Sequence, residues 1–126
     1  MNTKGNPILI TGGATGIGFA LAETLVNAGN KVITCGRREN KLNEAKQKLP
    51  QIQRKVCDVS VEKEREALFV WVKDNYPDLN VLINNAGIQR MIILKKGTKE
   101  LFNGENEIET NLVAPINLAA YFIPWF

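Results

Sequence analysis

The chain has 126 residues, of which 44% are hydrophobic and 23% are charged, and its formal net charge at pH 7 is +3. This composition is typical of one globular domain with a sizeable core. Basic and acidic residues are interleaved and no apolar run reaches the ~18 residues of a membrane span, so the sequence argues against a nucleic-acid or membrane partner and favours a cytoplasmic location.

The first predicted element is a buried strand over 8–10, which a glycine-rich turn joins to a helix over 16–28. In this turn Gly12, Gly16 and Gly18 have the spacing Gly-x-x-x-Gly-x-Gly. Glycines allow close approach of a ligand, and the helix start offers unpaired N–H groups and a positive dipole end, which favours a pyrophosphate. The alternative is a tight turn that binds nothing, and the flanking strand and helix argue against it. The candidate cofactor residues of this turn are Thr11, Gly12, Thr15, Gly16, Ile17 and Gly18.

A second buried strand, predicted over 31–35, is followed by Gly36-Arg37-Arg38. Strand, helix and strand make a βαβ unit, in which the residue after the second strand meets the adenosine ribose of a dinucleotide. A carboxylate there selects the 2′-hydroxyl of NAD, whereas the fork of an arginine matches the 2′-phosphate of NADP. No carboxylate stands at this place, so we expect NADP over NAD, with Arg37 a better candidate than Arg38. A solvated surface pair beside Glu39 is the alternative.

Between the second and the fourth strand, helix and strand continue to alternate. Asp58 follows the third strand, and two roles stay open for it: its carboxylate accepts a hydrogen bond from an adenine amino group, or it caps the next helix. Ser60 is the better candidate for that cap. The elements predicted here are a charged amphipathic helix over 40–49, an edge strand over 53–57, an amphipathic helix over 61–76 and a buried strand over 81–83.

Three motifs together resemble the short-chain dehydrogenase/reductase family: the glycine-rich turn, Asp58 before Val59, and Asn84-Asn85-Ala86-Gly87 after the fourth strand. The resemblance covers the chain from about Pro7 to its end. It implies an α/β fold over residues 1–126, an incomplete Rossmann-like dinucleotide-binding domain with a doubly wound parallel sheet of strand order 3-2-1-4 in three α/β/α layers. The cofactor-binding residues that it adds are Asp58, Val59, Asn85, Ala86 and Gly87.

A finer resemblance points to a Gram-positive bacterial oxidoreductase subgroup associated with D-alanine esterification of teichoic acids. The segments that carry it are Leu49-Pro50, Asn85-Ala86-Gly87-Ile88-Gln89, Lys96-Gly97-Thr98 and residues 111–115.

Beyond Ile88 we expect a loop over 89–104 and then a helix that begins near Glu105. Asn111 in this helix matches the catalytic asparagine of the family, and the resemblance implies that it holds a water in a proton relay to an active-site lysine. A buried structural asparagine is the alternative. Pro115 lacks an N–H and should kink the helix near Asn111.

The resemblance also implies hydride transfer with a catalytic serine, a tyrosine and a lysine four residues after the tyrosine. Ser60 is the only serine, and the tyrosines Tyr76 and Tyr121 are followed four residues later by Asn80 and Trp125. Histidine is absent, which excludes His-based triads and argues against a zinc site, since only two cysteines remain as soft ligands; we expect no metal. The chain thus indicates the cofactor-binding half of an oxidoreductase, inactive alone, whose substrate the sequence does not assign.

Two other functions remain open. One is a non-catalytic nucleotide-binding or interaction module. The other is a methyltransferase, which the lack of an acidic residue after the second strand disfavours. The apolar residues Phe122, Ile123, Trp125 and Phe126 of the last helix, together with an unprotected edge at 81–83, predict a homo-oligomer in each case.

Overall fold

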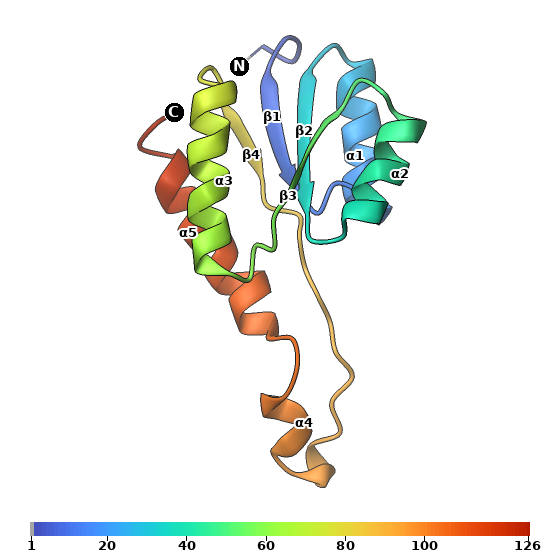
Figure 1. The fold of residues 1–126 in the computed structure, drawn as a ribbon, viewed down its shortest axis with the longest axis vertical. Helices are drawn as coiled ribbons and strands as arrows, with labels where there is room; N and C mark the ends of the chain where they lie inside the picture. The colour runs from blue at the N-terminus through green and yellow to red at the C-terminus, as the bar shows by residue number, and fades with distance from the viewer. Residues whose placement is uncertain (1) are drawn as a thin grey trace.

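The computed structural model describes residues 2–126 and shows one sheet of four parallel strands in the order β3-β2-β1-β4. Helices α1 and α2 cover one face of the sheet, and α3 and α5 cover the other (Figure 1). The predicted α/β class and the strand order 3-2-1-4 are therefore confirmed. The elements are β1 (Pro7–Thr11), α1 (Gly16–Asn27), β2 (Lys31–Gly36), α2 (Glu39–Lys48), β3 (Gln53–Val56), α3 (Glu62–Asn75), β4 (Val81–Ile83) and α5 (Ala114–Phe122). As far as β4, each predicted boundary lies within one residue of the observed one.

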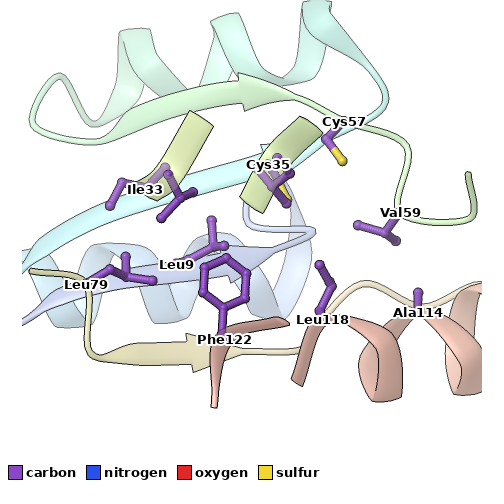
Figure 2. Packing of buried hydrophobic residues seen from close by; sticks show 11 residues of the cluster. Leu9, Ile33, Cys35, Cys57, Val59, Leu79, Ala114, Leu118 and Phe122 are labelled. Atoms are coloured by element: carbon purple, nitrogen blue, oxygen red, sulfur yellow. The ribbon is translucent and has the colours of Figure 1, made fainter. Parts of the chain in front are cut away.

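Each of the two central strands is apolar on both faces, as a strand covered by helices on both sides must be. Successive side chains of a strand point to opposite faces, so Leu9 and Ile33 pack toward α3 and α5, whereas Ile8 and Ile10 pack toward α1 and α2. Figure 2 shows the first of these clusters, in which the Phe122 ring lies against Leu9. The cysteines Cys35 and Cys57 are buried free thiols.

The parallel register brings the carboxyl ends of the strands to one edge of the sheet. Thr11 lies opposite Cys35, and Ile10 lies opposite Ile83. The glycine-rich turn after β1 and the Asn-Asn-Ala-Gly segment after β4 therefore leave the sheet side by side, and the two arginines follow β2 at the same edge.

After β4 the chain leaves the body of the molecule as an arm, residues 89–104, and then returns toward the last helix (Figure 1). The sequence predicts a plain loop here, but the arm contains two short helical turns, η1 (Leu94–Lys96) and α4 (Lys99–Phe102). The large apolar side chains Met91, Leu94 and Phe102 are exposed on it.

The last helix begins at Glu107, two residues later than predicted, and passes through the π-helical segment η2 (Glu109–Val113) into α5. Pro115 stands in the first turn of α5, and it has no N–H to donate to the carbonyl of Asn111. The distortion expected near Asn111 is therefore a π-helical widening. Among residues 2–126, no helix has the length and apolarity needed to cross a bilayer.

Candidate functional site

A cleft of about 340 Å³ opens at the edge where the carboxyl ends of the strands meet. Its walls come from the glycine-rich turn, the end of β2, the segment after β3 and the segment after β4. Ten predicted cofactor residues line it: Gly12, Thr15, Ile17, Arg37, Arg38, Asp58, Val59, Asn85, Ala86 and Gly87. Six further residues line it that sequence reasoning did not select: Ala14, Gly36, Lys41, Cys57, Ile88 and Thr110.

Thr11 does not line the cleft, but it holds two of its walls together. Its buried hydroxyl oxygen accepts hydrogen bonds of 3.0 Å from the backbone N–H groups of both Asn85 and Ala86. The Asn85 side chain in turn donates from Nδ2 to the carbonyl oxygen of Gly12, across 3.1 Å. The segment after β4 is thus fastened to the glycine-rich turn at three points.

The glycines of the turn allow this close packing. A Cβ on Gly18 would lie 2.2 Å from the Gly12 carbonyl oxygen and 2.5 Å from Asn85 Nδ2, so no other residue fits there. Gly12 has φ of 68° and lies against the Ala86 backbone, and Gly16 has φ of 56°, a left-handed conformation that favours glycine. Gly16 and Gly18 therefore act through the shape of the turn, since neither lines the cleft.

The start of α1 faces the cleft. Thr15 is its N-cap residue, yet the Thr15 side chain makes no capping hydrogen bond, and no acidic side chain stands in the first turn. The first N–H groups of a helix need partners, and with the positive end of the dipole they attract an anion. This is the arrangement that suits a pyrophosphate.

Three cations line the cleft beyond β2: Arg37, Arg38 and Lys41. Arg37 forms an ion pair through Nη1 with Glu105, at the base of the arm. The hydrogen bond that Arg37 donates to Glu105, and more weakly the charge of Asp58, raise the pKa of the Arg37 guanidinium above its ordinary value. The sequence signal for Lys41 was its place at the start of the helix predicted over 40–49, where a cation follows the two arginines closely.

Asp58 lines the cleft and also organises the turn that leads into α3. Its Oδ1 accepts hydrogen bonds from the backbone N–H and the hydroxyl of Ser60, across 3.0 and 2.7 Å. The prediction that Ser60 caps the next helix is wrong, because its hydroxyl is bound to Asp58 and the N-cap residue of α3 is Val61. A contact of Asp58 with adenine stays a prediction.

Asn111 holds the chain where it leaves the cleft. Its Oδ1 accepts from the backbone N–H of Ile88 across 2.8 Å, and its Nδ2 donates to the Ile88 carbonyl oxygen across 2.7 Å. The side chain is exposed, so a buried structural asparagine is wrong, but both of its polar atoms are used in this pairing. The neighbouring Thr110 lines the cleft, which places η2 against the site.

Arg65 does not line the cleft but supports one of its walls, and sequence reasoning did not select it. It lies 2% exposed on the inner face of α3, and its Nη1 donates across 2.7 Å to the carbonyl oxygen of Val59, which lines the cleft. The sequence contains a sign of this role: Arg65 lies on the same helical face as Leu68 and Val72, where an apolar residue is expected.

The comparisons with known proteins agree with this geometry. A family model described as short chain dehydrogenase matches residues 6–126. The uncharacterized oxidoreductase DltE of Bacillus subtilis is 55% identical over 124 residues, which are 98% of this chain and 49% of DltE. A tropinone reductase homolog of Datura stramonium is 42% identical over 89 residues, which are 67% of this chain and 33% of that protein.

Two solved structures share the fold. A short-chain dehydrogenase from Streptomyces avermitilis has a TM-score of 0.82 at 27% identity, over 94% of this chain and 44% of that one. L-sorbose reductase from Gluconobacter frateurii, complexed with NADPH and L-sorbose, has a TM-score of 0.82 at 25% identity, over 97% of this chain and 48% of that one. The chain thus spans about half the length of DltE and of these two structures.

Proposed function

Since this chain belongs to the short-chain dehydrogenase family, we propose that residues 1–126 are the dinucleotide-binding domain of an NADP-dependent oxidoreductase. The reaction would be carbonyl reduction or alcohol oxidation, for which bound NADP(H) supplies or accepts the hydride. The observation that carries this proposal is the cleft itself, which brings together the start of α1, three cations and the glycines Gly12, Gly36 and Gly87.

The residues present fit a dinucleotide. The uncapped start of α1 beside Thr15 and Ile17 would hold the pyrophosphate. Asp58 and Val59 would face the adenine, and the segment from Asn85 to Gly87 would face the nicotinamide ribose. Within the chain, a Cβ on Gly87 would meet nothing closer than 3.5 Å, so the need for glycine there would come from the ligand.

The basic residues after β2 favour NADP over NAD. A 2′-phosphate is a dianion that an arginine fork binds by charge-assisted hydrogen bonds, and Arg37 and Arg38 both line the cleft. The bound NADPH of L-sorbose reductase, which this chain resembles in fold, supports the same choice.

Asn111 would contribute to the reaction by holding Ile88 and a water in place. Its side chain fixes Ile88, and Pro115 leaves the Asn111 carbonyl without its α-helical donor. That carbonyl would be free to hold a water of a proton relay.

The two tyrosines of the chain are occupied elsewhere. Tyr121 stacks on Phe69 with ring centroids 5.2 Å apart, and Tyr76 packs against Trp71 at 5.4 Å. Burial raises the pKa of Tyr76 further from neutrality, which makes it a poorer general acid or base. Because none of the cleft residues within 2–126 is a tyrosine or a serine, we propose that the 126-residue chain is inactive alone. The same observation favours a second candidate, a nucleotide-binding module without catalysis.

Fluorescence titration with NADPH and NADH tests the cofactor choice. We expect NADPH to bind about tenfold to a hundredfold more tightly, which is the contribution of a charge-assisted pair, and Arg37→Ala to lose that preference. The matched control is Arg54→Ala, because Arg54 binds Asn43 outside the cleft. Equal affinities for the two nucleotides in the wild type would refute the choice. Carbonyl-dependent NADPH oxidation by protein of verified mass would refute inactivity.

A further inference from the structure

An ion pair joins Glu105, at the base of the arm, to the cleft. Arg37 follows β2 and lines the cleft, whereas Glu105 lies 68 positions later, where the arm returns to the body. Both side chains are 45% exposed, so the pair sits at the rim, within reach of solvent and of a ligand. Of the three cleft cations, Arg37 is the one whose carboxylate partner comes from beyond β4; Lys41 pairs with Glu44 on its own helix.

A guanidinium that already binds a carboxylate is not free to bind a phosphate in the same geometry. Carboxylate and phosphate both use the planar fork of an arginine, and here the Nη1 corner of that fork is taken by Glu105. A phosphate that approached while Glu105 stayed in place would also meet the repulsion of its negative charge.

We propose that Glu105 is an internal competitor for the 2′-phosphate: its carboxylate occupies Arg37 in the nucleotide-free chain and must be displaced when the phosphate binds. Glu105 thereby sets how strongly the chain discriminates NADP from NAD. This inference rests on the proposed function, in which Arg37 reads the 2′-phosphate.

The arm can release Glu105 without coming apart. Arg90 holds the two ends of the arm together, because it donates to Glu107 from Nε across 2.5 Å and to the Asn103 carbonyl oxygen from Nη1 across 2.6 Å. These contacts do not involve Glu105. Displacement of Glu105 therefore costs only the rim ion pair, and such exposed pairs contribute up to about 1 kcal/mol, which is roughly fivefold in affinity.

The test is calorimetric titration of the 126-residue chain with 2′,5′-ADP and with 5′-AMP, which differ in the 2′-phosphate. We expect Glu105→Gln to bind 2′,5′-ADP roughly twofold to fivefold more tightly than the wild type, with no change for 5′-AMP. The gain should shrink at high salt, because both groups are exposed. The matched control is Glu100→Gln, which removes the same charge from the arm at a residue that pairs with Lys96, outside the cleft.

The outcomes separate this inference from the proposed function. No gain in Glu105→Gln, or an equal gain in Glu100→Gln, overturns the role of Glu105 even where the wild type prefers 2′,5′-ADP. If the wild type binds 2′,5′-ADP and 5′-AMP equally but the Glu105→Gln variant prefers 2′,5′-ADP, the role of Glu105 is supported and the NADP preference of the chain is overturned. If the gain persists in the double variant Arg37→Ala/Glu105→Gln, competition at Arg37 is overturned.

Discussion

The Nη1 group of Arg65 donates to the carbonyl oxygen of Val59 across 2.7 Å, and this contact joins the buried face of α3 to a wall of the cleft. The same guanidinium donates to Asn117 Oδ1 across 2.6 Å and to Glu109 Oε1 across 3.2 Å. A buried cation is tolerated only when such partners replace its water. Arg65 therefore fixes three segments against one another: the turn at Val59, the π-helical segment η2 and helix α5.

Replacement of Arg65 by methionine should lower the free energy of unfolding by about 1–3 kcal/mol, because the Val59 carbonyl and the Asn117 amide lose their buried partner. Urea denaturation measures this loss. Lys63→Met on the exposed face of the same helix is the control, with an expected change below about 0.5 kcal/mol. Equal losses in the two variants would show that the guanidinium has no special role.

A methyl group on Gly18 should disrupt the glycine-rich turn. The new Cβ would fall 2.2 Å from the Gly12 carbonyl oxygen, and that backbone can move only by breaking its contact with Asn85. We expect Gly18→Ala to lower stability by about 1–3 kcal/mol and to weaken nucleotide binding. Gly36→Ala is the control for stability alone, because Gly36 lines the cleft but its Cβ would meet Leu42 at an ordinary 3.8 Å. Thermal unfolding compares the two, and a wild-type melting temperature for Gly18→Ala would be the contrary result.

The chain should self-associate through its last helix. Phe122 does not contribute to the exposed apolar patch that the sequence predicts, because it is fully buried against Leu9 and Phe69. An apolar stripe remains at Leu112, Ile116 and Ile123, all exposed and on one face by their helical spacing.

Light scattering at micromolar concentration should therefore show a dimer or a higher oligomer, and Ile116→Lys should shift it to monomer. The control is Val70→Lys, which places the same charge on an exposed apolar position of α3. A wild-type monomer without dye-detectable apolar surface would contradict this prediction. An oligomer that Ile116→Lys does not affect would show that the interface lies elsewhere on the molecule.

The features that could be predicted from the sequence are those specified by neighbouring residues. The glycine-rich turn, the arginines after β2 and the segment from Asn85 to Gly87 are continuous motifs at strand ends, and parallel strands bring such ends to one edge. Lys41 and Thr110 reach the cleft from helices, and Arg65 supports the cleft wall at Val59 from a third helix, so their places depend on how those helices dock.

The same distinction explains the predictions that were wrong. Ser60 has the chemistry of a helix cap, but the carboxylate two residues earlier takes its hydroxyl. Phe122 looks exposed in an apolar run, but only the packing of α5 on α3 and the sheet decides which face of that run is covered.

The fastening of Thr11 to Asn85 has a consequence for the order in which the molecule folds. These two residues lie 74 positions apart, whereas β1 pairs with β2 through a single intervening helix. Closing the longer loop costs more chain entropy, and contacts of high sequence separation form slowly. We therefore expect β1, α1 and β2 to assemble first and the cleft to form only when β4 docks. In pulse-labelling hydrogen exchange, the amides of Asn85 and Ala86 should gain protection after those of β2, and simultaneous protection would show a single concerted step.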